Sequence, residues 1–461
     1  MNGFSTIILA AGMGTRMKSD KCKVLHEICS KPLVQWVYEA AQKAGSEKTV
    51  LVVGHKKEDV IAAMGEDKLY AYQEVRLGTG HAVMMTEEFF KDYDGTVVIL
   101  SGDTPLITEE TVLRAVKYHE ENENSVTGIT AILDNPFGYG RIVRDENGSF
   151  IRIVEQKDAS EEEKKINEIN SGMYCFDSKD LFHALSKITN KNAQNEYYLT
   201  DTLEILRNEG KKVDASPLCT PEEILGVNDR VNLAVTQKIK QSQIVKKHML
   251  NGVTVIDPDN TYIDDDVEIA PDAVIYPSTF LKGKTKISSG CIIGPSSTIE
   301  NSEIGKNTKV INSVVNDSKV AENSDIGPFA YLRPNSVIGS DVKIGDFVEI
   351  KNSTIGDGTK VSHLTYVGDS DVGKGVNFGC GTVTVNYDGV SKHRTVIGDN
   401  VFLGCNTNLV APVKVANNSV IAAGSTITED VDEYSLAIAR SRQTEKKDWA
   451  RSFGWNNKKN K

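Results

Sequence analysis

The middle of this 461-residue chain carries an aliphatic residue at every sixth position, and this spacing constrains the fold more than any other feature. The repeat is clearest from Ile326 to Val367, where the aliphatic residue is often followed by glycine. A helix requires spacings of three and four residues, and a half-buried strand requires alternation. A period of six instead suits a parallel coil of short strands, each pointing one aliphatic residue inward to stack on its neighbours. We therefore expect a β-helix.

The repeat begins near Gly252 and continues beyond Leu403 with a few slips. Between Gly381 and Ile397 it is interrupted. An insertion in a regular coil must loop out, and surface loops of this kind often carry function. The interruption therefore marks a candidate functional loop.

The first half of the chain alternates short apolar runs with helical stretches. This order predicts a parallel sheet covered by helices, with ligands at the carboxyl ends of its strands. We expect a separate β-rich insertion between Val126 and Tyr174. The expected strands are Ser5–Leu9, Thr49–Val53 and Thr96–Leu100, and the expected helices are Leu33–Ala44 and Glu58–Met64.

Apolar residues from Arg230 to Leu250 recur at helical spacing, which predicts a connecting helix. The domain prediction is a nucleotide-binding α/β domain over residues 1–229, a helical linker over 230–251, and a β-helix with a C-terminal tail over 252–461. The predicted fold class is a Rossmann-like α/β domain followed by a parallel β-helix of hexapeptide repeats, and the left-handed sense of this β-helix is implied by the family resemblance described below.

A formal net charge of −11 argues against a general binder of nucleic acid or membrane surfaces. The seven cysteines are scattered and include no CxxC pair, which favours free thiols in a reducing cytoplasm over a disulfide framework or a zinc site. We expect a cytoplasmic protein, because no stretch approaches the roughly 20 apolar residues of a membrane span.

The segment Leu9–Arg16 follows a strand directly, and its small residues allow a close approach to phosphate. Taken alone, the segment could also be a simple tight turn. Arg16 and Lys23 add two cations beside it, and Asp103 follows another strand, where a divalent cation could bridge protein and phosphate.

With these residues in place, the chain resembles the family of bifunctional N-acetylglucosamine-1-phosphate uridyltransferases/glucosamine-1-phosphate acetyltransferases. The motifs that carry the resemblance are Leu9–Arg16, Lys23–Leu25, Gln73, Gly78–Thr79, Gly102–Asp103, Gly138–Ile142, Ile153–Glu155, Asn170–Met173, Glu196–Asp201 and Gly226–Asp229. The resemblance implies that Asp103 and Asn228 hold Mg²⁺, and the role of Asn228 rests on it alone. Arg16 and Lys23 would act at the phosphates of UTP. The implied contacts of UTP and UDP-N-acetylglucosamine are Leu9, Ala10, Ala11, Gly12, Lys23, Gln73, Gly78, Thr79, Gly140, Glu155, Asn170 and Asn228.

The repeats contain a second group of polar residues that a hexapeptide coil does not itself require. His363 stands near the cations Arg333 and Lys351, and its ordinary pKa near neutrality suits a general base. The resemblance implies that His363 deprotonates the amine of glucosamine-1-phosphate for attack on acetyl-CoA. The implied contacts of glucosamine-1-phosphate are Arg333, Lys351, Tyr366 and Asn377. Those of acetyl-CoA are Cys380, Asn386, Tyr387, Cys405, Ala423 and Arg440.

Two of these positions depart from the family pattern, because we expect Ala at Cys380 and Ser at Cys405. Both cysteines are small, so contacts through the backbone should survive. Cys405 has no hydroxyl for such a contact, and the thiols are candidate targets of thiol reagents. The alternative is that both cysteines are plain coil residues.

Three hypotheses follow. The favoured one is a bifunctional enzyme of UDP-N-acetylglucosamine synthesis that uses Mg²⁺, UTP, acetyl-CoA, glucosamine-1-phosphate and N-acetylglucosamine-1-phosphate. The alternatives are a nucleotidyltransferase whose β-helix is structural or regulatory, and a scaffold without activity. The family resemblance also implies a homotrimer, with acetyl transfer between neighbouring coils and no nucleic-acid or membrane partner.

Overall fold

The computed structural model describes residues 3–192 and 194–452. It contains two compact units, which divide between Gln241 and Ser242. This division lies within helix α8 (Arg230–Leu250), so the predicted connecting helix is confirmed. The domain limits at its two ends remain predictions, and residues 453–461 of the expected tail lie outside the described part of the chain.

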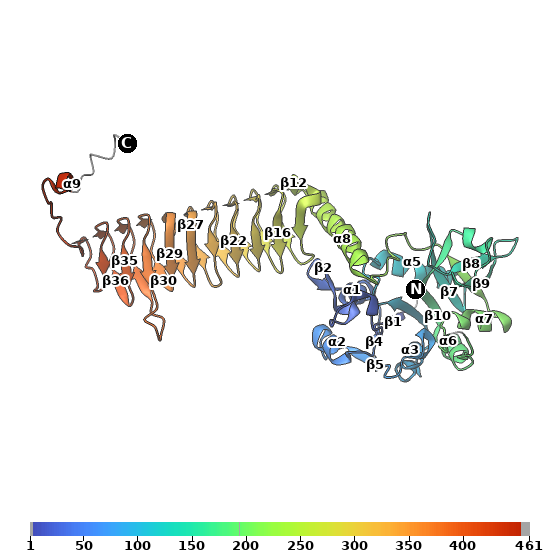
Figure 1. Ribbon diagram of the computed structural model, residues 1–461. Helices are drawn as coiled ribbons and strands as arrows, with labels where there is room; N and C mark the ends of the chain where they lie inside the picture. Colours follow the sequence, from blue (N-terminus) through green and yellow to red (C-terminus); the bar gives the residue numbers. More distant parts are fainter. Residues whose placement is uncertain (1–2, 193, 453–461) are drawn as a thin grey trace. The chain divides into compact units, whose positions relative to one another are not determined.

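The first unit is built on a twisted sheet with strand order β11-β7-β10-β6-β1-β4-β5 (Figure 1). A hairpin of β8 and β9 branches from β10. The bounds of these strands are β1 (Phe4–Leu9), β4 (Thr49–Val53), β5 (Leu69–Tyr72), β6 (Thr96–Ser101), β7 (Val126–Ile132), β8 (Arg141–Arg144), β9 (Phe150–Val154), β10 (Glu168–Asp177) and β11 (Val213–Ser216). A small ribbon of β2 (Glu27–Ile28) and β3 (Lys31–Pro32) stands apart.

Two details of the predicted sheet are wrong. Strand β10 runs antiparallel to both β6 and β7, so the sheet is mixed rather than parallel. The stretch from Val126 to Tyr174 is also no separate insertion, because β7 and β10 lie inside the main sheet and only the β8–β9 hairpin projects. An apolar run indicates a buried strand but not the direction in which it runs. The sequence pattern therefore could not reveal that β10 is antiparallel.

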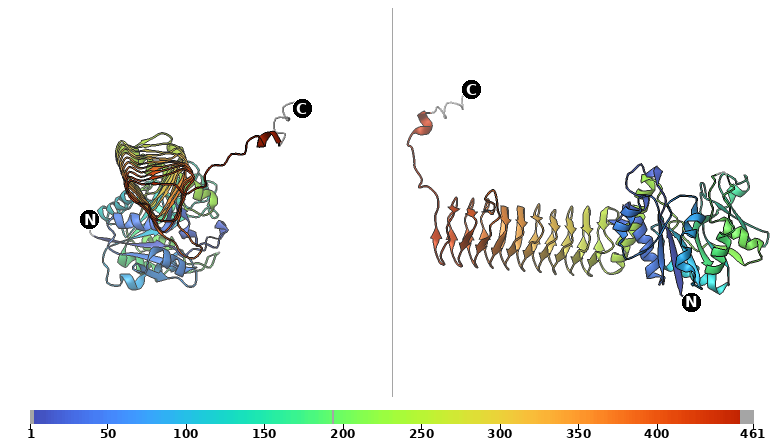
Figure 2. Two further views of the ribbon diagram at one scale, coloured as in Figure 1. Left: turned by 90° about the vertical axis from the view of Figure 1, so that its left-hand side faces the viewer. Right: turned by 90° about the horizontal axis from the view of Figure 1, so that it is seen from below.

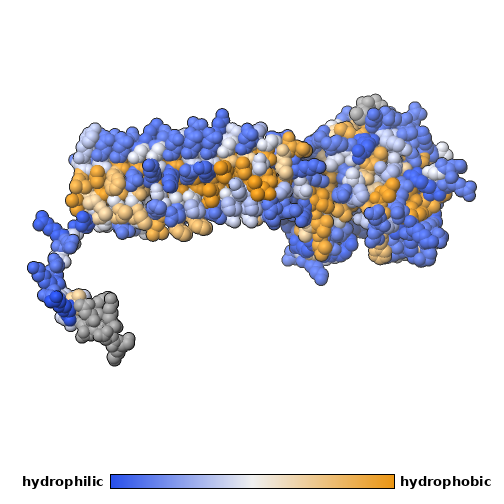
Figure 3. All heavy atoms as spheres, turned by 90° about the horizontal axis from the view of Figure 1, so that it is seen from above, coloured by the Kyte–Doolittle hydropathy of each residue, from blue (hydrophilic) through white to orange (hydrophobic). Residues whose placement is uncertain are grey.

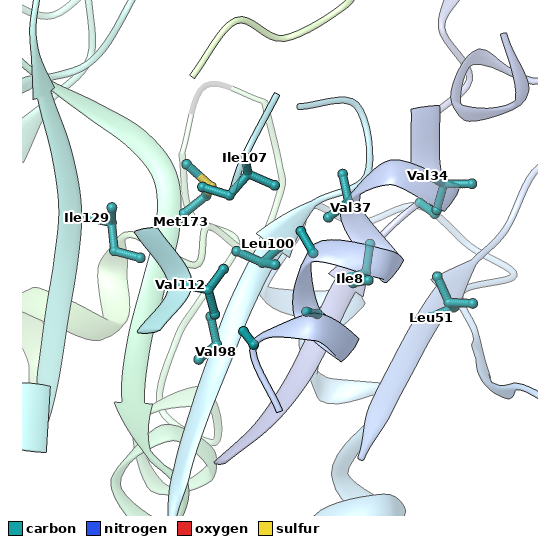
Figure 4. Close-up of a cluster of buried hydrophobic side chains, with 14 of the residues drawn as sticks. Ile8, Val34, Val37, Leu51, Val98, Leu100, Ile107, Val112, Ile129 and Met173 are labelled. Carbon is teal, nitrogen blue, oxygen red and sulfur yellow. The ribbon is translucent and has the colours of Figure 1, made fainter. Parts of the chain in front are cut away.

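Helices cover both faces of this sheet, because its central strands are apolar on both sides. Ile8 belongs to a cluster with helices α1 and α5, whereas its neighbour Ile7 belongs to a cluster with α3, α6 and α7. Figure 4 shows the first cluster, in which Val34 and Val37 of α1 face Ile8 and Leu51. The helices are α1 (Leu33–Lys43), α2 (Lys57–Met64), α3 (Thr79–Met84), α4 (Glu87–Phe90), α5 (Glu109–Glu121), α6 (Ser178–Leu185) and α7 (Asp201–Asn208).

The second unit is a parallel coil of three-sided turns, as the end-on view in Figure 2 shows. Nineteen of its strands form one continuous sheet that wraps round two sides, and nine form the third side. The first set is β12 (Thr254–Val255), β13 (Thr261–Ile263), β15 (Val274–Ile275), β16 (Thr279–Lys282), β18 (Ile292–Ile293), β19 (Thr298–Glu300), β21 (Lys309–Val310), β22 (Val314–Asn316), β24 (Asp325–Ile326), β25 (Tyr331–Leu332), β27 (Lys343–Lys351), β29 (Lys360–Gly368), β31 (Asn377–Phe378), β32 (Val383–Val385), β34 (Phe402–Leu403), β35 (Asn408–Val410), β37 (Val420–Ile421), β38 (Thr426–Ile427) and β39 (Leu436–Ala437). The second set is β14 (Glu268–Ile269), β17 (Lys286–Ile287), β20 (Glu303–Ile304), β23 (Lys319–Val320), β26 (Val337–Ile338), β28 (Thr354–Ile355), β30 (Ser370–Val372), β33 (Thr395–Ile397) and β36 (Val413–Val415). The predicted fold class is confirmed.

Equivalent residues of successive turns stack in register along the coil. Ile344 pairs with Val361, and Val361 pairs with Phe378, so the inward aliphatic residues form continuous buried columns. Small hydroxyl residues at the corners satisfy backbone carbonyls that the strands leave open; the Ser302 hydroxyl, for example, donates to Glu300 O at 2.7 Å. The next pairing after Phe378 is with Leu403, which confirms that the interrupting segment loops out of the coil.

We predict that Leu281→Ala lowers the free energy of unfolding of the β-helix by about 2–5 kcal/mol, because it empties part of a buried column. Lys286→Ala is the matched control: Lys286 pairs with Glu268 at 3.0 Å on the surface, and an exposed ion pair is worth at most about 1 kcal/mol. Hydrogen exchange of β-helix peptides measures both effects separately from the first unit. Equal loss of protection in the two variants would contradict the prediction.

Candidate active sites

The first site forms where strands β1 and β6 end. The Lys23 ammonium contacts the Asp103 carboxylate and lies 3.3 Å from Asn228 Oδ1. Arg16 Nη2 donates to the same Asn228 oxygen at 2.9 Å. Four of the predicted residues, distant in the sequence, therefore form one polar cluster.

The backbone explains why these residues meet. Gly14 has a left-handed backbone with φ +62°, and an added Cβ would lie only 2.4 Å from Lys23 Cβ, so the glycine turn packs directly on this lysine. Val227 N donates to Asp103 O at 2.9 Å, which anchors the segment that carries Asn228. The sequence placed Asn228 here only through the resemblance.

The donor set of this cluster fits a hard divalent cation. Asp103 offers a carboxylate and Asn228 an amide oxygen, and both face the Lys23 ammonium, so their oxygens already converge on one positive charge. Mg²⁺ is commonly held by one or two carboxylates, with substrate phosphates and water as its other ligands. Within residues 3–192 and 194–452, no three His, Cys, Asp or Glu side chains group as a metal cage.

A cleft of about 630 Å³ opens where β1 and β6 end, because Leu9 and Ser101 at these strand ends line it. Four predicted residues line it, namely Leu9, Thr79, Glu155 and Asn170. The sequence analysis gave no role to the other lining residues, although the resemblance quoted some of their motifs. They are Ser101, Gly138, Gln156, Lys157, Asp158, Gly172, Tyr174, Gln194, Glu196, Tyr198, Leu199 and Thr200.

Glu155 and Asn170 line one part of the cleft, and Gly140 packs against both of them. Asn170 N donates to Gly140 O at 2.9 Å, and a Cβ on Gly140 would lie 3.3 Å from a Glu155 carboxylate oxygen. The Tyr174 hydroxyl donates to Asn170 Oδ1 at 3.0 Å and fixes that amide. Partial loss of hydration raises the pKa of Glu155, with a smaller contribution from Asp158.

Gln73 and Gly78 are not among the residues that line the cleft. The Gln73 side chain is buried, and its Nε2 donates to Gly78 O at 3.0 Å and contacts His81 Nδ1 at 3.1 Å. The Thr79 hydroxyl accepts from Leu199 N at 3.1 Å. These contacts set the position of the 77–80 turn against the 196–199 segment.

The second site is a column of residues on one corner of the β-helix. Asp346 pairs with His363 in the strand register. The same register places His363 beside Cys380, Cys380 beside Cys405, and Cys405 beside Ala423. Three residues predicted for acetyl-CoA thus follow the predicted base, one turn after another.

Asp346 orients the imidazole of His363. The Asp346 carboxylate lies 2.8 Å from His363 Nδ1, which leaves Nε2 as the nitrogen that can face a substrate. The hydrogen bond from His363 lowers the pKa of Asp346. The sequence analysis missed Asp346, and only the coil register could have revealed it.

Three cations gather on the face that follows this corner. Arg333 is in register with Lys351, and its guanidinium forms an ion pair with Glu349 at 2.7 Å. Close contact with Lys392 lowers the pKa of Lys351, and Arg333 adds to this effect. Lys392 lies in the looped-out segment and was not among the predicted residues. Such a cluster of positive charges favours the binding of a phosphate group.

The looped-out segment is anchored beside this face. The buried Asn386 amide donates to Asp369 at 2.5 Å and lies 3.5 Å from the Tyr366 hydroxyl, while Tyr387 is exposed. Asn377 stands on β31, which precedes the corner, so it lies on the other side of the corner from Tyr366. The Arg440 side chain extends over Gly424, next to Ala423.

Known proteins share both halves of this architecture. Residues 5–217 match the family model described as Nucleotidyl transferase, and residues 394–429 match Bacterial transferase hexapeptide (six repeats). A protein named Bifunctional protein GlmU from Acetivibrio thermocellus is 61% identical over 449 residues, covering 97% of each chain. The chain belongs to the GlmU family. The GlmU protein from Caldanaerobacter subterraneus is 60% identical, and the alignment covers 97% of this chain and 98% of that protein. The GlmU protein from Clostridioides difficile is 53% identical, and the alignment covers 97% of both chains.

Membership of the GlmU family confirms the family predicted from the sequence. No helix in the described part of this chain is both long and apolar enough to cross a membrane.

We predict that Lys392→Met raises the pKa of Lys351, because the variant removes the nearest positive charge. Only the neutral amine reacts with acetic anhydride, so labelling of Lys351 at a fixed mildly alkaline pH should fall several-fold. Mass spectrometry reads the labelling, with Lys360 of the neighbouring strand β29 as internal reference and Lys392→Arg as the charge-preserving control. Unchanged labelling of Lys351 in Lys392→Met would show that the two side chains do not interact.

Proposed function

We propose that this GlmU family member catalyses two consecutive reactions of UDP-N-acetylglucosamine synthesis, acetyl transfer on the β-helix and uridylyl transfer in the α/β unit. The observation that carries the proposal is the presence of two polar clusters, one on each unit. A structural or regulatory β-helix would not need the Asp346–His363 pair beside the Arg333, Lys351 and Lys392 cations. A scaffold would need neither cluster.

In acetyl transfer, the cation cluster would bind the phosphate of glucosamine-1-phosphate, with Tyr366 and Asn377 orienting the sugar. His363, held by Asp346, would take the proton from the amine as it attacks the thioester carbonyl of acetyl-CoA. The coenzyme would run along Cys380, Cys405 and Ala423, with Asn386, Tyr387 and Arg440 bordering its path. The sulfur of coenzyme A leaves as a thiolate.

In uridylyl transfer, UTP and N-acetylglucosamine-1-phosphate would share the cleft lined by Leu9, Thr79, Glu155 and Asn170. The phosphate oxygen of the sugar would attack the α-phosphorus in line and release pyrophosphate. Asp103 and Asn228 would hold Mg²⁺, which when bound neutralises charge on the phosphates. Arg16 and Lys23 add positive charge on the same side. UDP-N-acetylglucosamine is a precursor of cell-wall glycans, and a cytoplasmic location remains our expectation.

Two variants separate the reactions. His363→Ala should lose about 10²–10⁴-fold in acetyl transfer, the usual contribution of general-base catalysis, and keep uridylyl transfer. Asp103→Ala should lose about 100-fold or more in uridylyl transfer, because a metal-held charge contributes several kcal/mol, and keep acetyl transfer. Release of coenzyme A and of pyrophosphate are followed separately.

The matched controls are His183→Ala and Asp94→Ala, which remove surface residues that pair with Glu209 and Lys179. Both controls should retain both activities. If the unmodified protein releases no coenzyme A, the β-helix is structural and the alternative of a single nucleotidyltransferase activity holds.

We also propose that the protein is a homotrimer, since the second site is open in one chain. Its residues lie on both sides of a corner, and the faces of a coil diverge from a corner, so a neighbouring chain would have to close the site. Three large apolar residues project at this corner on successive turns: Phe329, Phe347 and Leu364 are 58%, 61% and 59% exposed. Their backbones are left-handed, which is costly for bulky residues. Figure 3 shows that hydrophobic surface also runs as a band along the coil.

The double variant Phe329→Asn/Phe347→Asn tests the trimer. Asn312 occupies the same corner one turn earlier with a left-handed backbone, so asparagine suits these positions and the coil should fold. We expect light scattering to show smaller species and acetyl transfer to fall, while uridylyl transfer is retained. A variant that keeps the unmodified protein's mass would show that this corner is not the interface.

A further inference from the structure

Cys380 and Cys405 occupy equivalent corner positions on neighbouring turns. Phe378 pairs with Leu403 in parallel register, and each cysteine follows two residues later. Gly379 N donates to Leu403 O at 2.8 Å, and Asn406 N donates to Cys380 O at 2.7 Å, so the register continues through the corner. The two thiols therefore stand side by side, although the looped-out segment separates them in the sequence.

This register suits a disulfide bond. Neighbouring strands of a sheet lie about 4.8 Å apart, and a disulfide joins α-carbons that are about 4.4–6.8 Å apart. Side-chain rotation and a small approach of the two Cβ atoms are then needed to bring the sulfurs together. Cys405 is exposed and Cys380 is partly exposed, so both can meet a small reagent.

The other cysteines are poor competitors for such a reagent. All five are buried, and burial disfavours the thiolate that reacts with disulfides. Burial raises the pKa of four of them, namely Cys22, Cys175, Cys219 and Cys291. Oxidation should therefore be confined to the pair on the corner.

We propose that Cys380 and Cys405 form a thiol–disulfide modification site, at which a low-molecular-weight disulfide oxidises the pair and stops acetyl transfer. The effect on activity rests on the proposed acetyl-transfer function of this corner. The formation of the bond does not.

The chemistry is a pair of thiol–disulfide exchanges. The exposed Cys405 thiolate attacks the small disulfide, forms a mixed disulfide and releases one small thiol. The Cys380 thiolate then attacks the Cys405 sulfur and releases the second small thiol. The protein loses two protons and two electrons, and the small disulfide gains them.

The position of the pair explains why the bond would matter. His363 is in register with Cys380, so the bond would form one turn from the base, along the proposed path of the coenzyme. Joining the two side chains draws them together across that path. A shift of about 1 Å at a reacting centre can cost about 100-fold in rate.

The test treats the full-length protein with glutathione disulfide and follows both activities. We expect acetyl transfer to fall by about tenfold or more, uridylyl transfer to be unchanged, and dithiothreitol to restore the loss. Peptide mapping without reduction should show a Cys380–Cys405 cross-link that is lighter by two hydrogens. Cys380→Ala and Cys405→Ser, each compared with its own reduced form, should lose the cross-link and the reversible inactivation.

Each other outcome overturns the proposal. A stable mixed disulfide on Cys405 without a cross-link excludes the bond, and a cross-linked protein that retains acetyl transfer excludes the effect on activity. If reduced protein has no acetyl transfer, the proposed function of this corner fails and the effect on activity fails with it, whereas peptide mapping still decides whether the bond forms.

Discussion

The in-register stacking of parallel turns is the constraint on which the second half of this protein depends. Each turn hydrogen-bonds to the next, as from Gly379 N to Leu403 O, and each inward aliphatic residue stacks on its equivalents in the turns above and below. The same register acts on the outer surface. It lines up Asp346, His363 and Cys380, which lie in separate repeats of the sequence. One geometric rule therefore builds both the core and the candidate site.

The corner residues lie outside the stacked core, so their side chains can take on functional roles. Asn and Gly are the residues that tolerate a left-handed backbone, and Asn312, Asn406 and Gly424 hold this conformation in the corner column. Phe329 and Phe347 break the pattern in the same column, with rings stacked 5.6 Å apart and largely exposed. These bulky residues adopt an unfavourable backbone conformation and yet stay exposed in a single chain. This combination points to a contact with another chain.

The sequence predicts features that depend on local spacing and misses those that depend on chain direction or distant contacts. The six-residue period was sufficient for the coil and for the loop after Gly381, because every inward residue repeats the same environment. The antiparallel course of β10 was missed, since its apolar pattern is the same in either direction. The role of Asn228 was predicted only from the family resemblance. Its contact with Lys23 joins residues from the beginning and the end of the sequence of the first unit, and no local pattern indicates such a contact. Lys392 was missed because nothing in a loop sequence indicates which face it folds onto.

The tight stacking of the turns also explains why the corner can change its chemistry without loss of fold. A Cβ on Gly379 would lie 2.4 Å from Cys405 N, and one on Gly404 would lie 2.4 Å from Ala423 N. The glycines before Cys380 and Cys405 are therefore fixed by backbone packing. The corner residue itself projects outward and touches no buried column, so histidine, cysteine and alanine can follow one another there. Substitution at Cys380 and Cys405 consequently alters the proposed coenzyme path directly, while the hydrogen bonds and aliphatic columns that hold the coil remain as they were.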